Sequence, residues 1–241
     1  MDQNKCKIIV EFNGLPGCGK SAVCNELLNK LSKKNIQSSN NFDFPTPLYQ
    51  RFFHALYDGS IPFCYKMGKL ILSYKSNTWS FSYSLRFAWY FYQSYIYFIK
   101  SSSSKVMIID QGLLQLILSF CFIDPITDLR IIEQVLRIIR ESPFGESLLI
   151  VNCNLDINTS LERIIGRGKT DGSRLDRLQK ESRNSVVDAL VVQENNLQRL
   201  RSVFSKLDLG KHVTIDMMDT VGNNASSIYS LLIRQVSTTF E

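Results

Sequence analysis

The segment Gly14–Ser21 constrains the fold of this chain more than any other, because two glycines separated by four residues precede a lysine and a serine. The apolar run Lys7–Phe12 comes just before it and predicts a buried strand. Apolar residues then recur at helical spacing over Lys20–Leu31, which predicts an amphipathic helix. A glycine-rich turn between a strand and a helix points N–H groups at an anion, and the helix dipole favours the same anion. The pattern therefore predicts a phosphate-binding loop.

The positions of this loop have expected roles in binding ATP. Lys20 is expected to reach the β- and γ-phosphates, and the Ser21 hydroxyl to ligate Mg²⁺. Asp110 directly follows the apolar run Val106–Ile109 and is the expected second magnesium ligand, although an acid at a strand end is often only a turn residue. The predicted ATP-binding residues are Gly14, Leu15, Pro16, Gly17, Cys18, Gly19, Lys20, Ser21 and Ala22.

Strands and helices are expected to alternate along the rest of the chain. Further strands are predicted around residues 37–42 and over Val106–Ile109, Ser147–Val151 and Val213–Ile215. Helices are predicted over most of Phe52–Lys100, from Asp124-Pro125 onward, over Asn158–Leu200 with a break at Gly166–Gly172, and over Ser226–Val236. This order predicts an α/β fold with a doubly wound parallel sheet, covered by helices on both faces.

Composition narrows the class of protein and of ligand. The net charge of +6 is modest and suits a small anionic ligand at least as well as nucleic acid, which is therefore not an expected partner. The six cysteines have no zinc-site or redox-motif spacing, so we expect reduced thiols and a cytoplasmic protein. Phe81–Ile99 is nearly long enough to span a bilayer, but it contains Arg86 and is expected to be a buried helix. No membrane association is expected.

The order of these motifs resembles that of P-loop nucleoside and nucleotide kinases, the thymidylate kinase-like branch most of all. The resemblance rests on Gly14–Ser21, on the strand that ends at Asp110, and on Arg163 and Arg167 after the strand Ser147–Val151. The order of strands, helices and motifs is similar over most of the chain, but only the phosphate loop matches a specific sequence motif of the family. The resemblance implies one P-loop kinase domain over residues 1–241, with a helical acceptor-binding region at about 41–100 and a lid at about 160–180.

The resemblance also implies catalytic residues in the lid. In that family, lid arginines approach the transferred phosphoryl group, which implies this role for Arg163, Arg167 and Arg174, alongside Lys20. An arginine supplied by the same chain neutralises charge in phosphoryl transfer, so the chemistry agrees. The alternative is a solvated charged helix, in which the arginines pair with neighbouring acids such as Glu162.

Two departures from the thymidylate kinase pattern leave the phosphoryl acceptor open. Those enzymes carry an arginine after the aspartate of the third strand, whereas Asp110 is followed by Gln111 and Gly112. Their acidic-proline motif after the second strand is matched here only by Asp43-Phe44-Pro45, in which the acid comes one residue too early.

The acceptor is nevertheless expected near Asp43 and Arg86. Asp43 could accept a hydroxyl proton from a nucleoside, which would make it both catalytic and acceptor-binding, and Arg86 could bind an acceptor phosphate. Eleven aromatic residues lie between Trp79 and Phe98, and they could stack on a base or simply form core.

These observations lead to an expected function. It is ATP- and Mg²⁺-dependent phosphoryl transfer to a nucleoside or nucleoside monophosphate. Two alternatives stay open: a kinase for another small molecule, such as an antibiotic or a sugar, and a non-catalytic nucleotide-binding regulator. The expected partners are ATP and a small-molecule acceptor, and a homodimer is left open.

Overall fold

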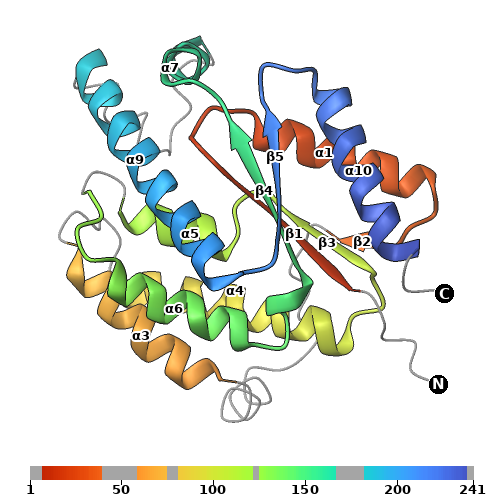
Figure 1. Ribbon diagram of the computed structural model, residues 1–241, viewed down its shortest axis with the longest axis horizontal. Coiled ribbons are helices and arrows are strands. Elements are labelled where there is room, and N and C mark those ends of the chain that lie inside the picture. Colours follow the sequence, from red (N-terminus) through yellow and green to blue (C-terminus); the bar gives the residue numbers. More distant parts are fainter. Residues whose placement is uncertain (1–6, 40–58, 75–80, 122–124, 167–181, 238–241) are drawn as a thin grey trace.

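A parallel sheet of five strands forms the centre of the computed structural model, which describes residues 7–39, 59–74, 81–121, 125–166 and 182–237. The strand order is β2-β3-β1-β4-β5 (Figure 1). The strands are β1 (Ile8–Gly14), β2 (Ser38–Ser39), β3 (Val106–Ile109), β4 (Leu148–Asn154) and β5 (Lys211–Asp216). Because all pairings are parallel, the carboxyl ends of the strands meet at one edge of the sheet.

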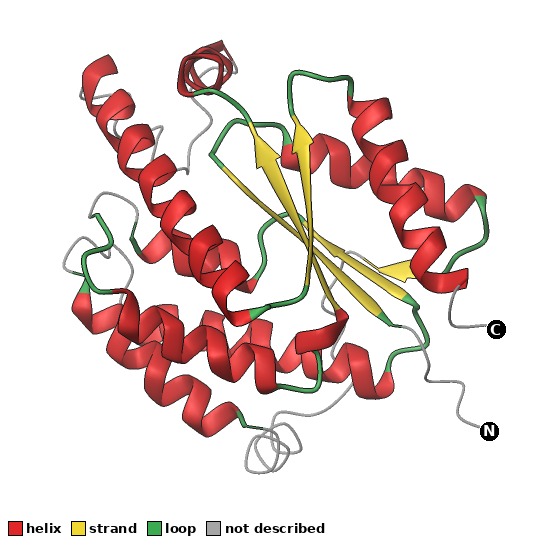
Figure 2. Cartoon of the chain, viewed as in Figure 1, coloured by secondary structure: helices red, strands yellow, loops and turns green. Residues whose placement is uncertain are grey.

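Helices cover both faces of this sheet (Figure 2). One face carries α1 (Lys20–Lys33) and α10 (Val221–Ser237). The opposite face carries α3 (Ser60–Ser73), α4 (Phe81–Ser101), α5 (Leu113–Phe120), α6 (Leu129–Glu141) and α9 (Arg183–Leu207). The short helix α7 (Ile157–Gly166) follows the carboxyl end of β4, and a 3₁₀ turn (Gly145–Ser147) precedes that strand. The predicted doubly wound α/β fold is confirmed.

The central strand β1 is buried along its whole length because both of its faces are covered. Ile9 packs in the core under α4, α5 and α9, whereas Val10 and Phe12 pack under α1 and α10. Successive side chains of a strand point to opposite faces, so Glu11 and Asn13 face the α5 and α9 side together with Ile9. Two polar side chains are therefore buried in the central strand, Glu11 at its middle and Asn13 near its carboxyl end.

The aromatic segment of the chain forms α4, and much of it is core. Tyr92 stacks on Phe63 of α3 with ring centroids 4.3 Å apart, and Tyr95 meets Phe144 edge-on at 5.2 Å. The expected helix is confirmed, and most of its side chains from Ala88 to Phe98 are buried, whereas Phe81 and Tyr83 in its first turn are exposed. Within the described part of the chain, none of the helices combines the length and the apolar character needed to cross a membrane.

Two helices differ from their prediction. The helix expected from Asp124-Pro125 begins only at Leu129, where the side chain of Asp128 accepts a hydrogen bond from the N–H of Arg130. The prediction was wrong because the N–H of Ile126 donates to Asn196 of α9 at 2.8 Å, so this segment is tied to another helix. Helix α5, which follows β3 directly, was not predicted at all.

Candidate phosphate-binding site

The loop between β1 and α1 has the curled backbone that the sequence predicts. Gly17 and Gly19 have φ angles of 80° and 99°, which lie in the left-handed region that favours glycine. A Cβ added at Gly17 would come within 2.7 Å of Ile164 in α7. Backbone conformation and close packing therefore both require glycine at this position. The loop leads directly into α1, whose N-terminus has no side-chain cap and carries the positive end of the helix dipole.

The Lys20 side chain lies against this loop and is nearly buried. Its ammonium group donates to the carbonyl oxygens of Gly14 at 3.0 Å and Leu15 at 2.9 Å, and it lies 3.7 Å from the sulfur of Cys18. The sequence predicts a side chain free for phosphate, whereas the structure pairs it with the loop itself. An oxyanion is a stronger partner for an ammonium group than a carbonyl, so a phosphate in the loop would compete for these contacts.

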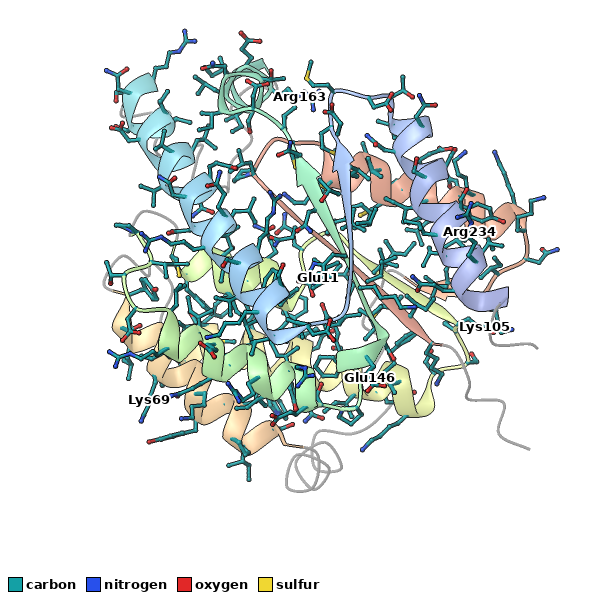
Figure 3. All side chains as sticks on the ribbon, in the orientation of Figure 1. Glu11, Lys69, Lys105, Glu146, Arg163 and Arg234 are labelled. Atoms are coloured by element: carbon teal, nitrogen blue, oxygen red, sulfur yellow. The ribbon has the colours of Figure 1, made fainter. Side chains whose placement is uncertain are left out.

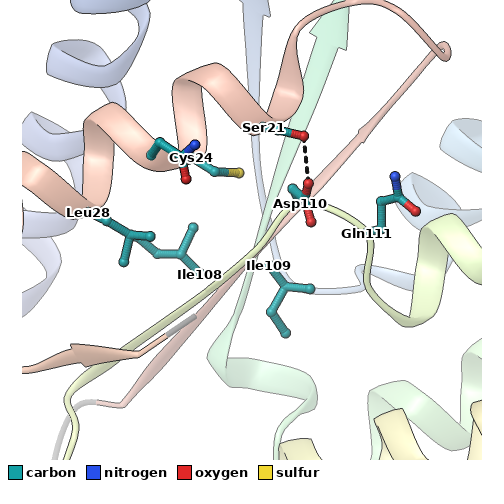
Figure 4. A pocket seen from close by; sticks show the side chains of 8 residues that line it. Ser21, Cys24, Leu28, Ile108, Ile109, Asp110 and Gln111 are labelled. Atoms are coloured by element: carbon teal, nitrogen blue, oxygen red, sulfur yellow. Dashed lines mark hydrogen bonds between the residues drawn. The ribbon is translucent and has the colours of Figure 1, made fainter. Parts of the chain in front are cut away.

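Ser21 and Asp110 come together at the predicted magnesium site. Asp110 directly follows β3, which pairs with β1, and its Oδ2 accepts a hydrogen bond from the Ser21 hydroxyl at 2.6 Å (Figure 4). The two residues border a cavity of about 210 Å³ between α1 and β3, lined also by Cys24, Asn25, Leu28, Ile108, Ile109 and Gln111. Hydroxyl and carboxylate oxygens are ligands that Mg²⁺ accepts, and this ion usually completes its shell with waters and substrate phosphates. The Ser21–Asp110 pair fits such an ion. Among the described residues, no group of three or more His, Cys, Asp or Glu side chains could hold a metal by itself.

Helix α7 supports the loop through hydrogen bonds from two of its side chains. The Ser160 hydroxyl donates to the carbonyl of Pro16 at 2.6 Å. Arg163 donates to the carbonyl of Cys18 and to that of Met217, which follows β5, at 3.1 Å each (Figure 3). Of the predicted lid arginines, Arg163 thus lies at the loop and is bound to backbone oxygens. Arg167 and Arg174 lie outside the described residues.

A buried carboxyl group, which the sequence analysis missed, ties β1 to α5. Glu11, labelled in Figure 3, is fully buried. It accepts hydrogen bonds from the Tyr95 hydroxyl at 2.8 Å and from the N–H groups of Leu114 and Gln115. The side chain of Gln115 in turn accepts from the N–H of Gly14 at 3.3 Å. Because α5 begins three residues after Asp110, these contacts fix the backbone on both sides of the site. The signal in the sequence was a charged residue inside an otherwise apolar strand.

Burial raises the pKa of Glu11 to about 7, because a charged carboxylate is disfavoured away from water, while its hydrogen bonds to Tyr95 and the α5 N-terminus oppose this shift. The native protein therefore retains this proton to about pH 7, whereas the unfolded chain releases it near the ordinary value of 4.5. Between these two values the native state binds more protons, so the free energy of unfolding must fall as the pH rises.

We expect Glu11→Gln to remove this pH dependence. The wild-type free energy of unfolding should be about 3 kcal/mol lower at pH 7.5 than at pH 4.5 on account of Glu11 alone. Denaturant unfolding of both proteins across this range measures the difference. Other groups titrate in both proteins. The relevant quantity is therefore the slope of the free energy of unfolding against pH in the wild type minus the same slope in the variant. If the free energies of unfolding of the wild type and the variant change in parallel with pH, Glu11 is not protonated in the native state.

The acceptor residues expected from the sequence are only partly within the described chain. Arg86 is exposed on α4, and Asp43 lies outside the described residues. A polar position that was missed is Gln93, which is buried in α4 and hydrogen-bonds to Ser60 of α3. Asn13 and Asn152 are also buried, opposite each other on β1 and β4, and Asn13 finds no hydrogen-bond partner within the described part of the chain. Such buried polar atoms usually contact water or a ligand.

The fold and this loop together define a P-loop α/β protein. The chain matches no known protein-family profile and no curated protein sequence. Among solved structures it is similar to deoxyadenosine kinase from M. mycoides with bound dATP, with a TM-score of 0.51 and 13% sequence identity. The match covers 93% of this chain and 98% of the kinase. At this identity the likeness shows that the two proteins share a fold.

Proposed function

We propose that the protein is an ATP- and Mg²⁺-dependent kinase that transfers a phosphoryl group to a nucleoside or nucleoside monophosphate. The observation that carries this proposal is the pairing of Ser21 with Asp110 at 2.6 Å, beside a glycine loop that leads into a helix N-terminus. A loop for phosphates and oxygen ligands for a cation thus lie together. The shared fold with a deoxyadenosine kinase supports a nucleoside-type acceptor.

The chain's own groups would act mainly by positioning the phosphates and offsetting their charge. The loop N–H groups and Lys20 would bind the β- and γ-phosphates, with Lys20 exchanging its contacts to Gly14 and Leu15 for phosphate oxygens. Ser21 and Asp110 would hold magnesium, whose charge offsets the charge that develops on the phosphates. The contact of Glu11 with α5, and that of the Gln115 side chain with Gly14, would keep this arrangement fixed before ATP arrives.

We further propose that residues 160–180 act as a lid and residues 41–100 as the acceptor region of a single kinase domain. Arg167 and Arg174 would approach the γ-phosphate, whereas Arg163 starts from its contacts with Cys18 and Met217. Asp43 or Arg86 would contact the acceptor, Asp43 for a hydroxyl and Arg86 for a monophosphate. These assignments rest on the sequence resemblance and on the place of α4 and α7 in the fold.

The test is ADP formation from Mg-ATP with a panel of nucleosides, nucleoside monophosphates, sugars and aminoglycosides. We expect at least one nucleoside or nucleoside monophosphate to raise ADP formation well above the rate with ATP alone. Product analysis by mass spectrometry should then show the acceptor plus one phosphate. Activity with sugars or aminoglycosides only would establish a different kinase. Tight ATP binding with no acceptor-dependent turnover would instead indicate a nucleotide-binding regulator.

A further inference from the structure

Two cysteine side chains meet beneath the phosphate loop. Cys18 lies in the loop between Gly17 and Gly19, and Cys153 lies on β4 opposite Gly14 of β1. A Cβ built on Gly14 would come within 2.8 Å of the Cβ of Cys153 and 3.3 Å of the sulfur of Cys18. The missing side chain of Gly14 therefore provides the space in which these two cysteines approach each other. Both are free thiols and almost completely buried.

The surroundings of this pair shift the pKa values of its two thiols in opposite directions. The Lys20 ammonium lies 3.7 Å from the Cys18 sulfur, whereas the Cys153 thiol contacts the carbonyl of Val151 at 4.0 Å. The neighbouring Cys153 thiol and, to a smaller extent, the positive charge of Lys20 lower the pKa of the Cys18 thiol. The proximity of Cys18, together with burial, raises the pKa of the Cys153 thiol. Cys18 is therefore the member of the pair that more readily becomes a thiolate, which is the reactive form of cysteine.

We propose that Cys18 and Cys153 are a hydroperoxide-reactive pair that forms a disulfide across the phosphate loop. In the first step the Cys18 thiolate attacks hydrogen peroxide. A sulfur–oxygen bond forms, the oxygen–oxygen bond breaks, and hydroxide leaves and takes up a proton to give water. In the second step the sulfur of Cys153 attacks the Cys18 sulfenic acid. The disulfide forms, and the hydroxyl group leaves with the proton of Cys153 as a second water. Two thiols are oxidised and one peroxide is reduced.

A disulfide here would hold the loop in a different shape. Bonded sulfur atoms lie about 2.05 Å apart, much closer than two sulfur atoms in contact, so Cys18 must move toward β4. The flanking left-handed glycines allow this movement, but it displaces the loop N–H groups that would bind phosphate. Loss of nucleotide binding on oxidation therefore rests on the proposed function, whereas the thiol chemistry does not. In a cytoplasmic protein such a bond is expected to be transient.

Two other cysteines provide internal comparisons. Cys24 lies one turn along α1 from Lys20, but burial raises the pKa of its thiol further above the ordinary value, so it stays protonated. Cys121 is equally buried at the end of α5, where its thiol contacts the carbonyl of Ile117, in the core on the other face of the sheet. Cys121 is the matched control because it shares the burial of Cys153 and lacks the contact with Cys18.

The experiment treats the full-length wild type, Cys153→Ser and Cys121→Ser with hydrogen peroxide, and maps disulfides by mass spectrometry of protease digests. In the wild type and in Cys121→Ser we expect a peptide linked through Cys18 and Cys153, which dithiothreitol separates. In Cys153→Ser we expect no link, and instead a Cys18 sulfenic acid that dimedone traps. Melting curves of the reduced proteins establish that the variants are folded. The disulfide map of the wild type tests the proposal even if a variant does not fold.

Peroxide treatment that leaves Cys18 and Cys153 reduced, or links other cysteines instead, would overturn the proposal. Binding of a fluorescent ATP analogue separates this outcome from failure of the proposed function. We expect the reduced wild type to bind the analogue, the oxidised wild type to lose binding, and dithiothreitol to restore it. If the reduced protein binds no nucleotide, the proposed kinase function fails, and the disulfide is still judged by the peptide map alone.

Discussion

Lys20→Ala is expected to lower ATP-dependent phosphoryl transfer by about 10²-fold or more, as does the loss of a single preorganised charge-stabilising donor in other enzymes. The ammonium group of Lys20 already lies at the loop, within 3.0 Å of the carbonyl of Gly14. It therefore needs little movement to reach a phosphate bound by the neighbouring N–H groups. Its removal takes one positive charge away from the transferred phosphoryl group, on which negative charge develops.

The fold should survive this substitution. Lys20→Ala leaves two loop carbonyls without their donor, at Gly14 and Leu15, which costs on the order of 1 kcal/mol if water replaces the ammonium group. Lys33→Ala is the matched control, since it removes the same charge from an exposed position on the same helix. Initial rates and thermal melts of both variants against the wild type measure the two effects. Full activity of Lys20→Ala would rule out the phosphate-loop assignment.

The loop was predictable because its signal is local. Two glycines, a lysine and a serine at fixed spacing between an apolar run and a helical pattern specify strand, turn and helix without reference to the rest of the chain. Asp110 was predictable for a related reason, since an acid directly after an apolar strand must lie at the carboxyl edge of a parallel sheet. Helix α5 lacked such a signal. Its residues are buried on all sides, so no polar face marks a helical period.

The contacts that shape the site could not be predicted, because they depend on which strands and helices become neighbours. Glu11 meets the N-terminus of α5, more than a hundred residues further along the chain. Cys18 meets Cys153 because β4 pairs with β1 in one particular register. The contacts of Arg163 likewise could not be predicted from the sequence. The resemblance implies a contact with phosphate, and the structure binds its guanidinium to two backbone carbonyls.

Asp110→Asn is the second change for which we expect a large effect, a loss of Mg²⁺-dependent turnover of about 10²-fold. The amide oxygen of asparagine has the shape of the carboxylate oxygen it replaces, so it can still accept the hydrogen bond from Ser21. The substitution therefore removes the negative charge and leaves the local packing unchanged. Mg²⁺ binds carboxylates in preference to neutral oxygens, so the cation site should weaken while the loop stays intact.

Because the substitution weakens the cation site and leaves the loop intact, nucleotide binding measured with and without Mg²⁺ tests the prediction most directly. Titration with a fluorescent ATP analogue in the presence of EDTA should give the same affinity for Asp110→Asn and the wild type, because the loop N–H groups and Lys20 are unchanged. Addition of Mg²⁺ should then tighten binding in the wild type and have little effect in the variant. Asp188→Asn removes the same charge from an exposed position on α9 and should behave as the wild type. If Asp110→Asn responds to Mg²⁺ as the wild type does, Asp110 is a partner of Ser21 only, and the cation must be held by other residues.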